Sequence, residues 1–135
     1  MDKVLQENRH GVIFKFYEPK LRKDTSISSI CATFSSHIPP SMLEWMANRV
    51  PSMYYKPLIY LSCFGTYEDF RRRGYGRQMI QWVKDYFKHC VIWLEVGSVC
   101  EMTNEQLIGF YESEGFKCMP GYSEYSTHTV MYIDL

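Results

Sequence analysis

Residues 61–77 read LSCFGTYEDFRRRGYGR, and this stretch decides how the chain folds. The nearly continuous apolar run over residues 58–64 predicts a strand buried on both faces. The glycines at 74 and 76 let the backbone approach a ligand closely, and the helix that they open presents unpaired N–H groups and the positive end of its dipole. The stretch therefore predicts a pyrophosphate site, to which four arginines could add fork-shaped donors: Arg71, Arg72, Arg73 and Arg77.

The next residues continue a strand-helix-strand pattern. Apolar side chains recur at helical spacing from Gly76 to about Cys90, and residues 91–96 form another apolar strand. This order implies a right-handed crossover between parallel neighbours, with the glycine turn at the carboxyl end of the first strand, where open α/β sheets bind ligands. Gly65, near the end of that strand, could allow a bulge or splay that exposes backbone groups to the ligand.

A further helix follows. Thr103 with Gln106 forms a capping box, and Gly115 is typical of the left-handed residue that ends a helix. A helix end explains the Gly-Phe pair, since the phenylalanine can fold back onto the helix. It leaves Asn104 and Tyr111 without an explanation.

Together these residues resemble the GCN5-related N-acetyltransferase (GNAT) superfamily. Its acetyl-coenzyme A signature, Arg/Gln-x-x-Gly-x-Gly/Ala, matches residues 71–76, including Gly74, Tyr75 and Gly76. Its later Asn, Tyr and Gly-Phe positions match Asn104, Tyr111 and residues 115–116. The resemblance covers residues 58–119, the expected coenzyme-binding core. It implies an α/β (α+β) fold with a mixed central sheet and acetyl-CoA as cosubstrate, without a metal.

The resemblance also implies the chemistry, which is direct attack of a primary amine on acetyl-CoA in a ternary complex. An amine with a pKa of about 10.4 is protonated at pH 7, so its proton needs an acceptor. Glu95 is the candidate base, because it is placed like the base of the ribosomal-protein N-terminal acetyltransferases. Glu68 or a water molecule could act as the base instead. Without a catalytic role, Glu95 would be an ordinary carboxylate at the surface or the sheet edge. Tyr111 would give its proton to the departing thiolate, or else is a core aromatic.

We expect the backbone at the end of the first core strand and the start of the later helix to bind the coenzyme arm. The N–H groups of Phe64, Gly65 and Thr66 would face the thioester oxygen and the pantetheine amides. Asn104 would hold the pantetheine arm, a role compatible with capping the helix. Alternatively, the arginines form a run of charges that faces solvent, and backbone N–H groups do most of the phosphate binding.

Length and composition limit the rest. At 135 residues the chain, 1–135, is expected to form a single domain. A net charge of zero disfavours a sequence-independent nucleic-acid binder, and the sequence shows neither a signal peptide nor an apolar run that could span a membrane, so a cytoplasmic protein is expected. The cysteines and histidines show no ligand spacing for a metal, and Cys63 is expected to be a small buried hydrophobe.

Residues 1–57 are the expected acceptor side. We expect strands over residues 11–17 and 26–35, and a helix from Ser41 to Val50 with a capping box formed by Ser41 and Glu44. A last strand is expected over residues 128–133.

The acceptor itself stays open at this point. A protein lysine, an N-terminal amine and a small amine all fit, and a similarity of residues 103–116 to compact phage-encoded acetyltransferases favours a lysine. A catalytically silent member that binds coenzyme A, or a protein-interaction module, is the alternative. Tyrosines near the end of the chain could line an acceptor groove or form a homodimer contact: Tyr122, Tyr125 and Tyr132.

Overall fold

The computed structural model describes residues 2–18, 26–34, 38–66, 73–97, 102–121 and 128–135. Its elements are, in chain order, β1 (Asp2–Asn8), β2 (Gly11–Tyr17), β3 (Ser28–Phe34), α1 (Pro40–Arg49), the 3-10 helix η1 (Pro51–Tyr54), β4 (Leu58–Thr66), α2 (Tyr75–Tyr86), β5 (Val91–Val96), α3 (Asn104–Ser113), β6 (Lys117–Cys118) and β7 (Thr129–Asp134).

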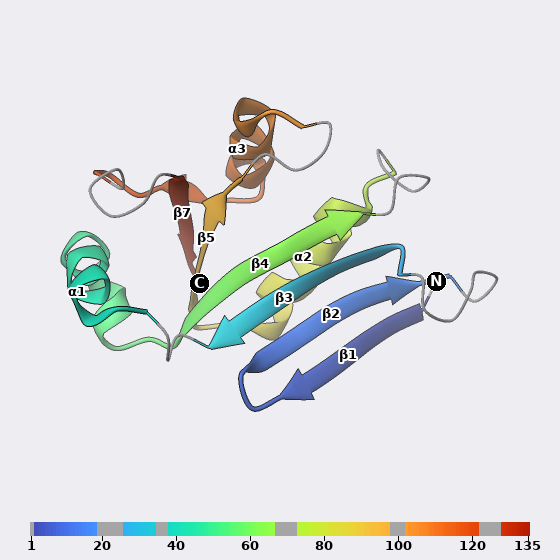
Figure 1. The fold of residues 1–135 in the computed structure, drawn as a ribbon, viewed down its shortest axis with the longest axis horizontal. Coiled ribbons are helices and arrows are strands. Elements are labelled where there is room, and N and C mark those ends of the chain that lie inside the picture. The colour runs from blue at the N-terminus through green and yellow to red at the C-terminus, as the bar shows by residue number, and fades with distance from the viewer. Residues whose placement is uncertain (1, 19–25, 35–37, 67–72, 98–101, 122–127) are drawn as a thin grey trace.

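The strands within these ranges form one seven-stranded sheet in the order β1-β2-β3-β4-β5-β7-β6 (Figure 1). The pair β4 and β5 is parallel and is joined through α2, while the other neighbours in the sheet are antiparallel. The predicted α/β (α+β) fold, with a mixed sheet around a strand-helix-strand core, is therefore confirmed.

The strands of the first half agree with the sequence pattern apart from β1. The strands expected over residues 11–17 and 26–35 are β2 and β3. β1 was not expected, because most of its residues are exposed and it has no apolar run. It joins β2 through a tight turn in which the Asn8 side-chain oxygen accepts from the N–H groups of His10 (2.8 Å) and Gly11 (3.1 Å).

The helix expected from Ser41 to Val50 exists as α1, but the predicted capping box at its start is wrong. Pro39 is the N-cap, and no side chain caps the helix. A proline in the first turn has no N–H that needs a partner, and its φ already suits a helix. The prolines therefore start α1 one residue before Ser41, and Pro51 begins the next element after it.

Two apolar layers cover the sheet from opposite sides. α2 packs on one face with Met79, Ile80 and Val83, against apolar residues of β2 to β5 and β7. α1 and η1 pack on the other face, over β5 and β7, in a second cluster built around Trp45, Met46 and Trp93. Alternate residues of β5 belong to the two clusters, as expected for a strand buried on both faces.

The parallel pairing of β4 and β5 is short. It runs from Leu58 and Val91 to Leu61 and Leu94, whereas β4 continues to Thr66 and β5 to Val96. Figure 1 shows the two strands starting side by side and then diverging. The splay that the sequence suggested is therefore present.

β4 also contains a bulge just beyond the last pair. Its register with β3 moves from Cys31 opposite Ser62 to Ser29 opposite Gly65, so β4 has one more residue than β3 in this interval. Cys63 lies in the bulge with a φ of 53°, in the left-handed region that non-glycine residues seldom adopt.

The structure corrects two expectations about this strand. Cys63 is exposed rather than buried. The strand is also not buried on both faces, since its buried residues are Ile59 and Leu61, which point to the same face. The extra residue reverses the alternation of side chains, so that Phe64 packs against the same cluster as Leu61, three positions earlier.

Both ends of α3 are set by the signals recognised in the sequence. The Thr103 hydroxyl accepts from the N–H of Gln106 (3.2 Å), and the Gln106 side chain accepts from the N–H of Thr103 (2.9 Å). At the other end Gly115 has a φ of 96°, and the N–H of Phe116 donates to the carbonyl of Tyr111 (3.0 Å). The rings of Tyr111 and Phe116 then lie 5.6 Å apart.

The close approach of β2 and β3 at Gly11 yields a test of the fold. A Cβ on Gly11 would lie 2.0 Å from the carbonyl oxygen of Ala32, a backbone atom that cannot move aside easily. We expect Gly11→Ala to lower the free energy of unfolding by about 1–3 kcal/mol in urea denaturation. Gly109→Ala is the matched control, because a Cβ there meets open space on α3 and should stabilise by up to about 1 kcal/mol. Equal effects of the two variants would contradict this packing.

Candidate active site

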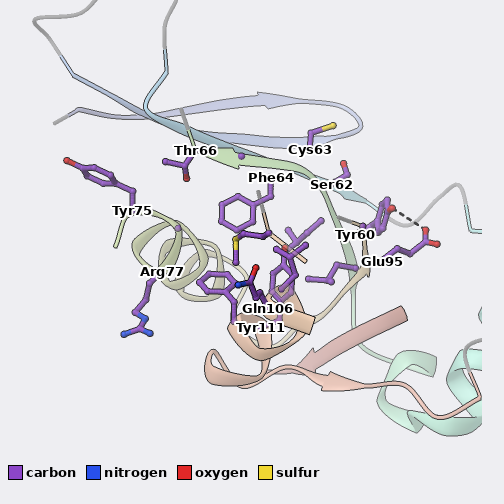
Figure 2. A pocket seen from close by; sticks show the side chains of 18 of the residues that line it. Tyr60, Ser62, Cys63, Phe64, Thr66, Tyr75, Arg77, Glu95, Gln106 and Tyr111 are labelled. Carbon is purple, nitrogen blue, oxygen red and sulfur yellow. Dashed lines mark hydrogen bonds between the residues drawn. The ribbon is translucent and has the colours of Figure 1, made fainter. Parts of the chain in front are cut away.

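A cavity of about 750 Å³ opens where β4 and β5 diverge. It reaches from the start of α2, along the end of β4, to α3 and the end of β5 (Figure 2). Among the described residues, those that line it come from positions 60 to 111: Tyr60, Leu61, Ser62, Cys63, Phe64, Gly65, Thr66, Gly74, Tyr75, Gly76, Arg77, Leu94, Glu95, Gly97, Met102, Gln106, Leu107, Phe110 and Tyr111. The predicted coenzyme core, residues 58–119, thus contains every described residue that lines this cavity.

The start of α2 forms one end of the cavity. Gly74 precedes the helix with a φ of 81°, and the helix has neither a side-chain cap nor an acidic residue in its first turn. The first N–H groups of a helix have no partner inside it, and the helix dipole is positive there, so this end favours an anion. A Cβ on Gly76 would lie 3.4 Å from the Phe64 ring and 3.7 Å from the Phe110 ring, so a larger side chain would fill the space beside them.

The last residues of β4 form the wall next to α2. Ser28, a buried residue of β3, donates its hydroxyl to the carbonyl of Gly65 (3.0 Å), and its oxygen lies 3.2 Å from the hydroxyl oxygen of Thr66. These contacts hold the end of β4 on β3 beyond the bulge. Because β5 has already diverged, the side of β4 that β5 would otherwise cover faces the cavity, and Phe64, Gly65 and Thr66 are among the residues that line it.

Glu95 lies at the other end of the cavity. It is the first residue of β5 after the last parallel pair, and its carboxylate oxygen Oε1 accepts a hydrogen bond from the Tyr60 hydroxyl (3.2 Å; Figure 2). Burial raises the pKa of Tyr60 to about 12, and the charge and hydrogen bond of Glu95 act in the same direction. Tyr60 therefore stays a neutral phenol at pH 7 and donates to the carboxylate.

Tyr111 enters the cavity from α3. Its side chain is 8 % exposed and packs edge-on against Phe110 and Phe116. Burial raises the pKa of Tyr111 to about 12, so this phenol also keeps its proton across the physiological range. The two predicted catalytic residues, Glu95 and Tyr111, thus line the same cavity from different elements.

The arginines predicted to bind the coenzyme do not all line the cavity. Arg71, Arg72 and the alternative base Glu68 lie outside the described residues. Arg73 is exposed and does not line the cavity. Arg77 borders it, but its guanidinium Nε donates to a carboxylate oxygen of Glu114 (2.9 Å). The structure thus gives Arg77 a protein partner.

Asn104 is the first residue of α3 and is exposed outside the cavity lining. Thr103, rather than Asn104, caps the helix, and Gln106 points toward the cavity instead (Figure 2). Sequence reasoning missed Gln106 and Tyr60 as site residues. Gln106 was visible as half of the capping box, whereas Tyr60 needs the register of β4 against β5, which places it opposite Trp93 and next to Glu95.

The described part of the chain has no group of three or more His, Cys, Asp or Glu side chains arranged to hold a metal ion. In the same residues no helix is long and apolar enough to cross a membrane.

Splayed parallel strands, a bulge and an uncapped glycine-led helix thus border one cavity. Residues 30–116 match the family model described as "Acetyltransferase (GNAT) family". The chain therefore belongs to the GNAT family and is an acyltransferase that uses acetyl-CoA as its cosubstrate. No curated protein matches the chain in sequence.

Solved structures agree on the fold. The Bacillus subtilis N-acetyltransferase YlbP in complex with coenzyme A superposes with a TM-score of 0.61 at 12 % identity, covering 91 % of this chain and 67 % of that one. Arabidopsis thaliana NAA60 in complex with acetyl-CoA gives 0.60 at 16 % identity, covering 93 % and 76 %. Arabidopsis thaliana Naa50 in complex with a bisubstrate analogue gives 0.56 at 18 % identity, covering 91 % and 72 %. The chain is thus shorter than each of these structures.

The cavity fits acetyl-CoA on features of the chain itself. The uncapped start of α2 suits the pyrophosphate, since it presents N–H groups and no side chain to compete for them. The end of β4 offers backbone donors for an arm that runs along it, and Phe64 and Phe110 give that path an apolar side. When bound, the coenzyme would supply an activated acetyl group as a thioester.

We expect Gly76→Trp to abolish binding of coenzyme A in calorimetric titration, because the indole would displace the Phe64 and Phe110 rings or fill the space between them. Gly109→Trp is the matched control, since Gly109 lies on α3 outside the cavity lining and a Cβ there meets open space. Circular dichroism would show that both variants are folded. Unchanged affinity in a folded Gly76→Trp protein would show that the coenzyme binds elsewhere.

Proposed function

We propose that the chain transfers the acetyl group of acetyl-CoA to a primary amine of a protein or peptide, by direct attack and without a covalent acyl-enzyme. One observation carries the proposal. The Glu95 carboxylate, held by the Tyr60 hydroxyl, lies at the opposite end of the cavity from the start of α2. An acceptor and the coenzyme could therefore enter one cavity from its two ends.

Glu95 would take the proton of the incoming amine, directly or through a water molecule. The amine must be neutral to attack, and its ordinary pKa of about 10.4 leaves only a small neutral fraction at pH 7. Tyr60 would position the carboxylate, because its hydroxyl donates a hydrogen bond to Oε1. Tyr60 keeps its own proton, since its pKa is raised to about 12.

The end of β4 would stabilise the negative charge that develops on the acetyl oxygen. Backbone N–H groups that are fixed in position before the reaction need no reorganisation as this charge appears. Ser28 fixes this part of β4 through the carbonyl of Gly65 and the hydroxyl of Thr66. The bulge at Cys63 and the departure of β5 leave the strand accessible from the cavity.

Tyr111 would assist the departing sulfur as a hydrogen-bond donor. A thiol leaving group has a pKa of about 8.5 by comparison with cysteine. Against a pKa of about 12 for Tyr111, complete proton transfer from the phenol to the thiolate would be uphill by about 5 kcal/mol. A hydrogen bond to the sulfur has no such cost. The proton that the amine releases would then neutralise the thiolate.

The acceptor class rests on two supports. Structures with the same fold include Naa50 with the bisubstrate analogue CoA-Ac-MVNAL and the NatC complex with a Gag peptide and coenzyme A, which favours a peptide amine. The similarity of residues 103–116 to compact phage-type acetyltransferases favours a lysine. The described residues of the first half, 1–57, add no side chain to the cavity lining.

The test is a coupled assay of coenzyme A release with two peptide pools, one with free N-termini and one with blocked N-termini and free lysines. We expect Glu95→Gln to lower kcat/KM by about 10²–10⁴-fold, since it removes the general base while keeping the shape of the side chain. Binding of coenzyme A should remain at the wild-type level, because Glu95 lies at the far end of the cavity.

Glu112→Gln is the matched control, because Glu112 is an exposed carboxylate of α3 outside the cavity lining. It should keep wild-type kcat/KM. Tyr60→Phe should have a smaller effect than Glu95→Gln, as expected for a residue that positions the base. If the wild type binds coenzyme A but acetylates neither pool, the chain is a catalytically silent member of the family.

A further inference from the structure

We propose that Cys31 of β3 and Cys63 of β4 form a reversible disulfide, and that this pair is a site of oxidative modification by peroxides. The site lies on the face of the sheet opposite α2, beside the Tyr60 and Glu95 pair. The disulfide does not depend on the acetyl-transfer chemistry and can be tested without it.

The register places the two cysteines next to each other. Cys31 is paired with Ser62, and Cys63 follows Ser62 directly. In a regular strand Cys63 would point to the other face, but it is the extra residue of the bulge. Figure 2 shows the Cys63 and Ser62 side chains on one side of β4 and Phe64 on the other. Cα atoms directly opposite in antiparallel strands, such as those of Cys31 and Ser62, are about 4.5–5.5 Å apart, and Cys63 is the next residue along β4, so the two cysteine side chains are near neighbours on this face.

Burial places Cys31 on this same face. Its neighbours along β3, Ile30 and Ala32, are buried in the cluster under α2, so Cys31 points away from that cluster. The two thiols interact, because the pKa of Cys31 is raised by burial and further by the charge of Cys63 and a hydrogen bond with it, against a lowering by Lys15. The sulfur atoms thus face each other across the two strands.

The roles of the two thiols follow from their exposure. Cys63 is exposed and lines the cavity, whereas Cys31 is partly buried. A peroxide from solvent would therefore meet Cys63 first, and Cys31 would be the resolving thiol, an arrangement typical of redox-sensitive cysteine pairs. The backbone at Cys63 is consistent with a special role, since a cysteine occupies a left-handed conformation that glycine adopts far more readily.

The chemistry is a two-electron oxidation by hydrogen peroxide. The Cys63 sulfur, as thiolate, attacks one peroxide oxygen, the O–O bond breaks, and the leaving hydroxide becomes water, which gives a sulfenic acid. The Cys31 sulfur then attacks the Cys63 sulfur, the S–S bond forms, the S–O bond breaks, and a second water leaves. A dithiol reductant reverses the reaction.

The test is peptide mapping by mass spectrometry under non-reducing conditions after treatment of the folded protein with hydrogen peroxide. We expect a cross-linked peptide that joins Cys31 to Cys63, a loss of two hydrogen atoms in intact mass, and recovery of both thiols with dithiothreitol. Cys31→Ser should prevent the link and leave Cys63 as a sulfenic acid that dimedone traps. Cys118→Ser, at another exposed cysteine, should leave the link unchanged.

Two results would overturn the proposal. One is oxidation of Cys63 in the wild type without any link to Cys31, and the other is a link from Cys63 to a different cysteine. Cys63→Gly keeps the proposal testable if Cys31→Ser folds poorly, because glycine is the residue best suited to a φ of 53°. That variant should lose the cross-link and leave Cys31 as a free thiol.

Discussion

The short parallel pairing of β4 and β5 is the constraint on which the rest of this structure depends. The strands pair only as far as Leu61 and Leu94, yet both continue beyond these residues. Where they diverge, the edges that would hydrogen-bond to each other border a cavity instead, and Glu95 occupies the first position after the last pair. The bulge at Cys63 adds to this effect, because it turns Phe64 to the side of α2 and α3. One interruption of the ladder thus creates both the space and part of its lining.

Polar contacts between α2 and the end of α3 hold the two helices that border this space. Arg77 donates to the buried carboxylate of Glu114, and Lys84 donates to the carbonyl of the same residue (2.8 Å). Lysine near the end of a helix also interacts favourably with the carbonyl end of the dipole. The start of α2 suits an anion because it has neither a side-chain cap nor an acidic residue in its first turn. Arg77, which the sequence analysis assigned to the phosphate, therefore also has a structural role.

The site combines the carboxylate of Glu95 with the phenols of Tyr60 and Tyr111. Burial keeps Tyr60 and Tyr111 protonated, so both are donors at pH 7, whereas Glu95 is the acceptor that Tyr60 addresses. The two phenols come from β4 and α3, and the carboxylate comes from β5. Their different elements explain why no short sequence motif contains all three. Because Glu95 is on β5 and Tyr111 is on α3, the acceptor end of the cavity is also separate from the wall that Tyr111 forms.

Local signals in the sequence determined much of this protein. The apolar run of β4, the helical spacing of α2, the Thr103 capping box and the Gly115 terminus all act through neighbours a few residues away, so they could be recognised without coordinates. The same holds for the glycine turn at Gly74. Proline chemistry was local too, yet the prolines before Ser41 prevailed over the capping box that the pattern favoured. The tertiary structure alone decided the contact of Tyr60 with Glu95, the partner of Arg77 and the exposure of Cys63. Each of these depends on the register between strands or on the packing of one helix end against another, and such relations join residues that are distant in the chain: Tyr60 and Glu95 are 35 positions apart, and Arg77 and Glu114 are 37 positions apart.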